Sequence, residues 1–182
     1  MNTPSAEVAE TDIRKSRPGD AAGIERLYGA AFPDEDLVPL VRELLVYGRG
    51  VISLVAAHRG AIAGHIVFSP CQVAAKENNV ALLGPLAVAP NVQKQGIGSA
   101  LIKAGFAALD NTGMDFVCVL GDPAYYGRFG FTVERRVATP YTLPDDWYEA
   151  WQSISLTNTA ETSPEGTLVV AEPWRHVALW CD

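Results

Sequence analysis

Apolar residues recur along the chain with two different periods, and the period indicates which secondary structure each segment forms. Apolar positions three or four residues apart predict a helix after Asp20, which is the expected N-cap. The same spacing predicts a second helix from about residue 34 to residue 47, with Gly48 as its C-terminal stop. Pro39 lies near the start of this segment, so the helix is expected to begin either at residue 34 or at the proline.

The sequence predicts strands at residues 11–17, 51–57, 61–68, 80–88, 116–120, 131–137 and 167–171. The strands 51–57 and 61–68 are expected to form a hairpin, with Arg59-Gly60 as its turn. The run 116–120 is apolar at every position, as in a buried central strand. Gly84-Pro85 interrupts the run 80–88, and because proline cannot donate to a ladder, a bulge or an end of strand pairing is expected there.

Three further segments have a weaker pattern. Residues 123–129 are expected to form a short helix or turn, residues 145–152 a short helix, and residues 158–166 a loop. Mixed strands and helices over this length predict an α/β (α+β) fold. We expect a loose segment at residues 1–10 and a single domain at residues 11–182.

The composition limits the classes of function. The 182 residues are 48% hydrophobic, which is enough to bury a full core in one domain. The net charge of −7 argues against a nucleic-acid-binding protein, which needs a basic surface. The charge is compatible with a cationic substrate such as an amine, and equally with ordinary surface charge.

The cysteine pattern argues against a disulfide framework and against a metal site. Cys71, Cys118 and Cys181 are odd in number and form no C-x-x-C pair. A reducing compartment is therefore expected. The chain has no apolar run of membrane-spanning length and begins with a polar, acidic segment, so we expect a cytoplasmic protein with no membrane partner.

The stretch GPLAVAPNVQKQGIGSALIKAGFAAL joins a strand to a helix through a polar loop with two glycines, Gly96 and Gly98. A helix N-terminus has unpaired N–H groups and a partial positive charge, so it binds phosphate when glycines allow close approach. Lys94 and Ser99 add a positive charge and a hydroxyl. On the glycine pair alone, a tight turn with close helix packing is an equally good interpretation. Neither a Walker loop nor G-x-G-x-x-G matches, since the third glycine position holds Leu101.

Two motifs in order extend this interpretation. Gln93-x-x-Gly96-x-Gly98 resembles the Q/R-x-x-G-x-G/A acetyl-CoA motif of the GNAT superfamily of N-acetyltransferases. Downstream, the segment from Tyr126 to Phe131, YGRFGF, resembles the family's Y-x-x-x-G-F. The resemblance covers residues 11 to 137 at least, is strongest to a bacterial branch of predicted N-acetyltransferases, and leaves residues 137–182 as a variable C-terminal part.

The resemblance implies a GNAT-like fold, a mixed and mostly antiparallel sheet flanked by helices, whose fourth and fifth strands splay apart around acetyl-CoA. It implies that the backbone of Leu86, Ala87 and Val88 pairs with the pantetheine arm. It further implies that one run of backbone amides holds the pyrophosphate. These are the amides of Gln93, Lys94, Gln95, Gly96, Ile97, Gly98 and Ser99.

In this family an amine attacks the thioester carbonyl directly, so the amine must lose a proton and the leaving thiolate must gain one. The resemblance places Tyr126 as the proton donor, with Tyr125 as the alternative. Packing at the strand end is the other interpretation of both tyrosines. A backbone N–H near Leu86 to Val88 is the expected oxyanion donor.

The general base is not identified, because residues 81–90 contain no acid on the fourth strand, where some family members carry a glutamate. A relayed water and four acids remain as candidates, although each acid is more typical of a helix cap or a surface charge. These acids are Asp34, Glu35, Asp36 and Asp122.

Other reactive or aromatic residues are first assigned to structure. His65 and Cys71 would form a nucleophile pair only in direct contact, and a half-buried structural histidine is the stronger expectation. Trp147, Tyr148 and Trp151 could line an acceptor pocket or a dimer contact, and packing is again the default.

Taken together, the sequence predicts an acetyl-CoA-dependent N-acetyltransferase that acts on a primary amine of a small molecule or peptide and uses no metal. The alternative is a non-catalytic acyl-CoA-binding sensor or interaction module, which the missing acid on the fourth strand favours. Dimers are common in the family, so a homodimer is one expected assembly.

Overall fold

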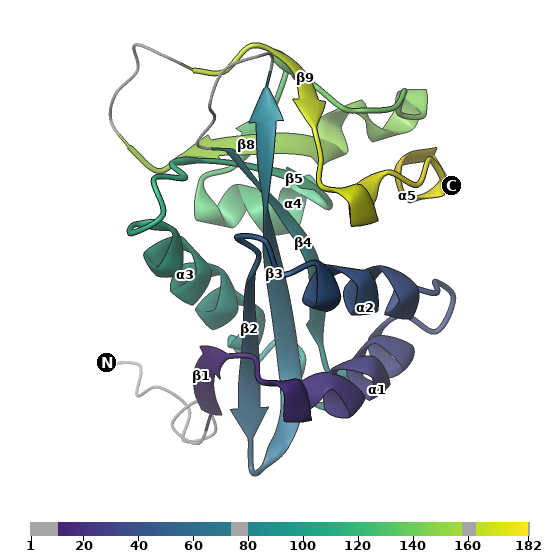
Figure 1. Ribbon diagram of the computed structural model, residues 1–182, viewed down its shortest axis with the longest axis vertical. Coiled ribbons are helices and arrows are strands. Elements are labelled where there is room, and N and C mark those ends of the chain that lie inside the picture. Colours follow the sequence, from purple (N-terminus) through teal and green to yellow (C-terminus); the bar gives the residue numbers. More distant parts are fainter. Residues whose placement is uncertain (1–10, 74–79, 158–162, 182) are drawn as a thin grey trace. The chain divides into compact units, whose positions relative to one another are not determined.

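The computed structural model describes residues 11–73, 80–157 and 163–181, which form strands and helices in alternation (Figure 1). The chain divides into two compact units. The first contains the chain up to Val67 together with Pro85–Ala108, and the second contains Phe68–Gly84 and the chain from Leu109 onward. Strands β3 (Ala61–Val73) and β4 (Val80–Val88) contribute residues to both units.

The first unit contains the predicted N-terminal strand and hairpin. β1 (Thr11–Lys15) pairs antiparallel with β2 (Ile52–His58), from Thr11 opposite His58 to Lys15 opposite Leu54. β2 neighbours β3, which in turn neighbours β4. β1 ends two residues earlier than predicted, because a 3-10 turn, η2 (Pro18–Asp20), follows it closely.

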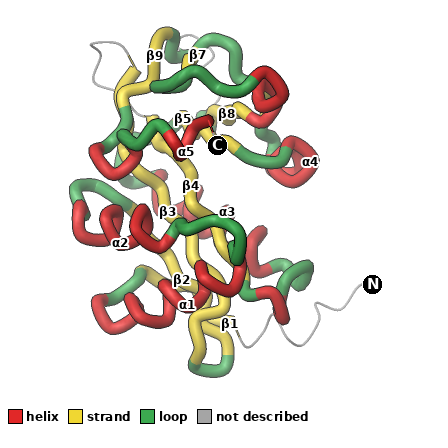
Figure 2. Tube along the Cα trace, turned by 90° about the vertical axis from the view of Figure 1, so that its right-hand side faces the viewer, coloured by secondary structure: helices red, strands yellow, loops and turns green. Residues whose placement is uncertain are grey.

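Both predicted N-terminal helices are present. α1 (Ala21–Ala31) and α2 (Val38–Tyr47) lie side by side in both views (Figures 1 and 2). α2 begins at Val38, one residue before Pro39, rather than at residue 34, and Gly48 ends it in the left-handed conformation, with φ of 63°. The two helices bury one apolar stripe. It contains Ile24, Leu27, Tyr28, Leu40, Val41 and Leu44.

α3 (Ile97–Leu109) packs on the opposite face of β3 from α1. Neighbouring residues of a strand point to opposite faces. His65 contacts Tyr28 of α1, whereas a β-carbon on Gly64 would touch Ile97 and Leu101 of α3. The first unit is therefore a layer of strands with helices on both faces.

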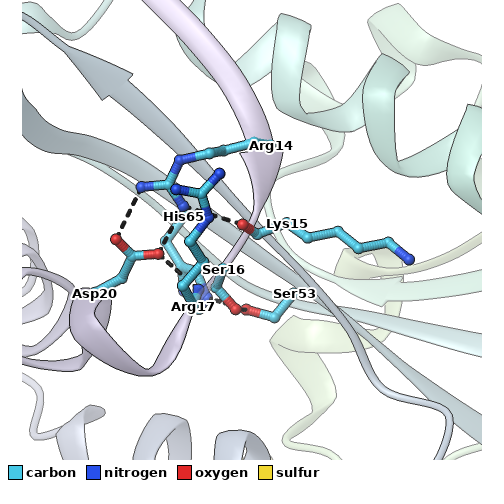
Figure 3. A network of polar contacts seen from close by, with 7 residues as sticks. All are labelled: Arg14, Lys15, Ser16, Arg17, Asp20, Ser53 and His65. Atoms are coloured by element: carbon cyan, nitrogen blue, oxygen red, sulfur yellow. Dashed lines mark hydrogen bonds and ion pairs between the residues drawn. The ribbon is translucent and has the colours of Figure 1, made fainter.

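Asp20 stands at the predicted N-cap position of α1, but its side chain does not cap that helix. Its carboxylate accepts two hydrogen bonds from the Arg14 guanidinium, at 2.7 and 2.9 Å, and one from the backbone N–H of Arg17 at 2.7 Å (Figure 3). The Arg14 hydrogen bonds lower the pKa of Asp20 to about 2. The prediction that Asp20 caps α1 is wrong. Its carboxylate pairs with Arg14 instead, because a bidentate, charge-assisted pair is stronger than the single hydrogen bond of a helix cap.

The second unit is built around β5 (Phe116–Leu120), the buried strand that the sequence predicts. β5 pairs parallel with β4 and antiparallel with β8 (Trp151–Ser155), and β8 also pairs with β6 (Thr132–Val133). The β4–β5 register runs from Val80 opposite Phe116 to Leu83 opposite Val119. It ends directly before Gly84-Pro85, so the predicted end of pairing is confirmed.

A second ladder explains why β3 is longer than predicted. Gln72 and Val73 pair antiparallel with Val169 and Leu168 of β9 (Gly166–Val169). β9 also pairs in parallel with β7 (Val137–Ala138). The late strand predicted at residues 167–171 is therefore confirmed at a slightly earlier position.

Two expectations for the C-terminal half need correction, and a third lies partly outside the described residues. The predicted strand 131–137 is two short strands, β6 and β7. The predicted helix 145–152 is a 3-10 helix, η5 (Asp145–Ala150), followed by β8, which the sequence pattern missed. Within the predicted loop 158–166, residues 158–162 lie outside the described residues. Pro123–Tyr126 forms α4 and Gly127–Phe129 forms the 3-10 turn η4, as expected.

The second unit has its own apolar core, closed by the C-terminal α5 (Ala178–Cys181), which the sequence did not predict. Its buried members come from every strand of that unit except β6. They are Cys71, Val73, Val80, Leu82, Phe116, Cys118, Val137, Leu143, Trp151, Leu168, Val170 and Trp180. Within the described part of the chain, no helix is long and apolar enough to cross a membrane.

Candidate functional site

The polar loop between β4 and α3 is fixed to the strand that precedes it. The backbone N–H of Ala89 donates to Ala63 on β3 at 2.8 Å, and residues 90–92 then form a 3-10 turn. The side-chain amide of Gln93 reaches back and donates to the carbonyl of Val88 at 3.1 Å. Gln93 therefore links the end of the predicted pantetheine strand to the start of the predicted phosphate loop.

The backbone of this loop twice adopts a left-handed conformation. Lys94 has φ of 62° and Gly96 has φ of 89°. A β-carbon on Gly96 would meet nothing within 4 Å, so the backbone angle is the reason for glycine at this position. Lys94 is exposed, which leaves its ammonium available to a ligand phosphate.

The turns at Lys94 and Gly96 leave a run of backbone amides without acceptors. Among the described residues, no acceptor is found for the amide N–H groups of residues 93–99. The first backbone hydrogen bond of α3 runs from the N–H of Ala100 to the carbonyl of Gly96, at 2.9 Å. Consecutive free amides at a helix N-terminus form an anion-binding site, and the helix dipole adds to it.

The first turn of α3 lies close to β3 because Gly64 has no side chain. A β-carbon on Gly64 would stand 2.8 Å from Cδ1 of Leu101 and 2.9 Å from Cγ2 of Ile97. Ile97 and Leu101 are both buried. The sequence analysis overlooked Gly64, although an isolated glycine inside a strand pattern signals close approach of another element.

The three residues expected to pair with pantetheine lie at the end of β4. Ala87 is buried, and Leu86 and Val88 are half-buried. They follow the point at which the β4–β5 register ends, and among the described residues β5 pairs with none of them. The pairing of this segment with pantetheine stays a prediction.

The two candidate tyrosines lie in α4 of the second unit, directly after β5. Asp122 caps this helix, because its Oδ1 accepts a hydrogen bond from the backbone N–H of Ala124 at 2.9 Å. Of the four acids considered as general base, Asp122 thus has a structural role. The other three are exposed in the turn between α1 and α2. They are Asp34, Glu35 and Asp36.

Tyr126 points back toward the end of β5. A β-carbon on Gly121 would stand 2.4 Å from Cε2 of Tyr126, so the phenol ring lies against the Gly121 backbone. Its other neighbours are Phe131, edge-on at 5.6 Å between ring centroids, and Tyr125 at 5.0 Å. Burial raises the pKa of Tyr126 above the usual tyrosine range, so the phenol keeps its proton at neutral pH.

Tyr125 faces a different environment. The Arg128 guanidinium lies over its ring, 4.7 Å from the centroid, and Phe129 packs at 5.5 Å. Burial raises the pKa of Tyr125, and the Arg128 charge opposes the shift. Among the described residues, the Tyr126 hydroxyl has no hydrogen-bond partner, whereas Tyr125 is engaged by a cation–π contact.

His65 is a structural residue and is more buried than predicted, with an exposed fraction of 0%. Its Nδ1 lies 2.9 Å from the Tyr28 hydroxyl and its Nε2 lies 2.8 Å from the Ser53 hydroxyl. Ser16 donates to Ser53 at 2.7 Å, which extends the network to the end of β1 (Figure 3). Burial lowers the pKa of His65 to about 3, so the ring is neutral at pH 7.

Cys71 is equally unsuited to nucleophilic chemistry. Burial raises the pKa of its thiol to about 12, and its Sγ donates to the carbonyl of Ser69. Trp151 is a core residue whose indole N–H donates to Val137 at 2.7 Å. Trp147 packs partly buried against the same core, and Tyr148 is exposed. In the described residues, no group of three His, Cys, Asp or Glu side chains is placed to hold a metal ion.

Comparison with known sequences points to one family. A family model described as Acetyltransferase (GNAT) family matches residues 21–131. The uncharacterized N-acetyltransferase YhbS of Escherichia coli is 30% identical over 165 residues, which cover 90% of this chain and 96% of YhbS. The uncharacterized N-acetyltransferase YjhQ of E. coli is 33% identical over 145 residues, covering 76% of this chain and 80% of YjhQ.

Solved structures agree with the sequence comparison. The GNAT family N-acetyltransferase YhbS of E. coli in complex with CoA is 29% identical with a TM-score of 0.83, and 92% of this chain and 93% of that chain are covered. A GNAT family acetyltransferase of Brucella melitensis in complex with acetyl-CoA is 32% identical with a TM-score of 0.73, and the coverage is 90% and 97%. The resemblance carried by the two motifs is thereby confirmed, and the chain belongs to the GNAT family of acetyltransferases.

Proposed function

We propose that the protein transfers the acetyl group of acetyl-CoA to a primary amine of a small molecule or peptide. The observation that carries this proposal is the run of amides from Gln93 to Ser99, which have no acceptor among the described residues. The two relatives solved with CoA and acetyl-CoA support the same donor. Acetyl-CoA is a co-substrate here, and no metal is required.

The residues of the loop fit the donor's pyrophosphate. The amides of residues 93–99 and the exposed Lys94 supply donors and positive charge for two phosphates. The backbone of Leu86 to Val88, with which β5 does not pair among the described residues, is proposed to supply strand-type hydrogen bonds for the pantetheine arm. Because Gln93 holds the Val88 carbonyl, the loop is oriented relative to that strand before the ligand arrives.

Two protons move during the transfer. The amine nitrogen bonds to the thioester carbonyl carbon as the carbon–sulfur bond breaks, giving an acetamide and the CoA thiol. The nitrogen loses one proton, for which we infer a water relay because Asp122 caps α4. The sulfur gains one proton, and Tyr126 is the proposed donor, since its phenol is protonated and its hydroxyl has no partner among the described residues.

Titration with acetyl-CoA and CoA tests donor binding without any assumption about the acceptor. We expect micromolar affinity for both ligands, and loss of that affinity in Gly98→Leu, which adds bulk at a buried position in the first turn of α3. The thermal unfolding of the variant serves as a control for its fold. No binding by the folded wild-type protein would overturn the proposal.

A second experiment separates the enzyme from the alternative, an acyl-CoA-binding sensor or interaction module. One observation favours that alternative, which is the absence of an acid between Ala81 and Pro90. Release of CoA thiol with a broad panel of amines would support the transferase. Tight acetyl-CoA binding with no thiol release from any amine would support the sensor.

A further inference from the structure

A pocket of about 470 Å³ lies in the second unit beside β6, the strand that ends the order of the sheet. β6 and β8 line it together with Phe116 of β5, Gly130 and residues 163–164. Every lining residue belongs to the second unit, and none belongs to the proposed donor-binding segments 86–88 and 93–99. The volume is within the range of about 300–1,000 Å³ that is usual for small-molecule sites.

The one carboxylate that lines this pocket is already hydrogen-bonded from within the protein. Oε1 of Glu134 accepts from the backbone N–H groups of Arg136 and Val137, and Oε2 accepts from the hydroxyl of Ser153. Ser153 is buried on β8. These three hydrogen bonds meet the charge of Glu134 and hold the backbone that carries the two arginines of the pocket.

The two arginines, Arg135 and Arg136, have no comparable partners. Arg135 is exposed, and within the described ranges its guanidinium makes no hydrogen bond or ion pair. Arg136 pairs with Glu165 at 3.2 Å, but the two side chains are 56% and 73% exposed. An exposed pair of this kind contributes at most about 1 kcal/mol, so a bound anion can replace it. The pocket therefore has two guanidinium groups that are available to a ligand.

We propose that this pocket binds a phosphate monoester that has an apolar body. The monoester carries about two negative charges at pH 7, which match the two guanidinium groups of Arg135 and Arg136. Guanidinium groups donate two parallel hydrogen bonds to phosphate oxygens, and the exposed hydroxyl of Thr132 can donate another. The side chains of Val133 and Ile154 line the same pocket and provide apolar surface for the body of the ligand.

The test compares three probes that share an aromatic ring and differ in charge. Phenyl phosphate is the dianion, benzoate is a monoanion and benzyl alcohol is neutral. In calorimetric titrations we expect the wild-type protein to bind phenyl phosphate with a Kd below about 1 mM, and benzoate about tenfold more weakly. Benzyl alcohol should show no measurable binding. The affinity for phenyl phosphate should fall as salt is added, because the contacts are charged.

Four variants locate the bound phenyl phosphate. Arg135→Gln should reduce its affinity about tenfold or more, as loss of a charge-assisted contact implies. Thr132→Trp fills the pocket and should abolish binding. Arg26→Gln is the matched control, because it removes an exposed arginine from α1 of the first unit and changes the net charge equally. Lys94→Gln tests the donor loop as another phosphate site. Both of these variants should bind phenyl phosphate as the wild type does.

Cooperative thermal unfolding reports whether each variant is folded, and Ser155→Trp takes the place of Thr132→Trp if that variant does not fold. No binding of phenyl phosphate by the wild type, or the same affinity in Arg135→Gln, would overturn the inference. So would a loss of affinity in Lys94→Gln, which would assign the phosphate to the donor loop, or an equal loss in Arg26→Gln. Tighter binding of benzoate than of phenyl phosphate would also overturn it.

Discussion

Ile97 at the start of α3 lies directly over Gly64 of β3, and a β-carbon on that glycine would stand 2.9 Å from its Cγ2. Real β-carbons almost never approach another atom so closely, so the absence of a side chain sets the distance between strand and helix. Residues 93–96 immediately precede Ile97, and they supply the first four of the amides proposed to bind phosphate. Gly64 therefore allows the first turn of α3, which directly follows the loop, to lie close to β3.

Substitution of Gly64 should therefore weaken donor binding indirectly. In Gly64→Val the added methyl groups force α3 away from β3, at a cost of about 1–3 kcal/mol in the free energy of unfolding. We expect affinity for acetyl-CoA to fall about tenfold or more, as a displacement costing about 1.4 kcal/mol would produce. Calorimetric titration and urea unfolding measure the two effects.

The control is Gly29→Ala on α1, where a β-carbon would meet nothing within 4 Å. Alanine favours helix over glycine by about 1 kcal/mol, so this variant should be as stable as the wild type or more stable. Its affinity for acetyl-CoA should not change. Unaltered acetyl-CoA affinity in a folded Gly64→Val protein would show that the loop does not depend on this packing.

Gly96 tests the loop through its backbone alone. Its φ of 89° is unfavourable for any residue with a β-carbon, although there is open space around it. Gly96→Ala should change the loop conformation, misdirect the amides of residues 93–99 and reduce acetyl-CoA affinity about tenfold, since strain of this kind costs about 1–2 kcal/mol.

Gly127→Ala is the matched control for Gly96→Ala. Gly127 also has open space within 4 Å, but its φ of −57° is one that alanine adopts readily. We expect acetyl-CoA affinity and stability close to those of the wild type. A similar loss of affinity in both variants would mean that the left-handed turn is not the cause.

The elements that the sequence predicts correctly are those whose pattern is set locally. α1 and α2 have regular apolar stripes, and β5 is apolar throughout. β8 was missed because its buried positions include polar residues, Gln152 and Ser153. Gln152 donates to the carbonyl of Gly121, and Ser153 donates to the carboxylate of Glu134. These hydrogen bonds make burial of the two polar side chains favourable. Their partners lie far away in the sequence, so no local pattern indicates them.

The candidate site also has one part that the local sequence predicts and another that depends on tertiary structure. The phosphate loop is local, because its glycines, its turn and the helix that follows lie within a few consecutive residues. The packing of α3 on Gly64 is not local, since Gly64 and Ile97 meet only in the folded chain. A glycine within a strand indicates that another element approaches closely, but not which element.

The buried imidazole of His65 predicts a loss of stability in mild acid. Its pKa is about 3 in the folded protein against an ordinary value of 6.5, so between these values only the unfolded chain binds the proton. The stabilising contribution is therefore complete above about pH 6.5 and falls as the pH drops toward 3, by at most about 1.4 kcal/mol per unit. Urea unfolding between pH 7 and pH 5 measures this slope.

His65→Gln keeps a polar side chain beside Tyr28 and Ser53 but cannot gain a charge. We expect lower stability at pH 7, because two hydrogen bonds are altered, and a flatter dependence on pH. The carboxylates titrate in both proteins, so the difference between the two slopes isolates His65. Identical slopes would show that another group causes the acid sensitivity.

Proton transfer to the leaving sulfur depends on the Tyr126 hydroxyl in the proposed mechanism. Tyr126→Phe removes the phenol proton and leaves the ring against Gly121, so turnover should fall about tenfold or more while acetyl-CoA affinity is retained. Tyr125→Phe is the control, and it should keep most of the activity because the ring under Arg128 remains. Initial rates of CoA thiol release, together with calorimetric titration, separate chemistry from binding.

A substitution at Gly121 tests the position of the phenol rather than its proton. The β-carbon of Gly121→Ala would stand 2.4 Å from Cε2 of Tyr126, so the ring must move away from the end of β5. Turnover should then fall as it does in Tyr126→Phe, and the double variant should be no slower than Tyr126→Phe alone. If the fold-decrease in turnover of the double variant equals the product of the two single decreases, the Gly121 substitution affects turnover by a route that does not involve Tyr126.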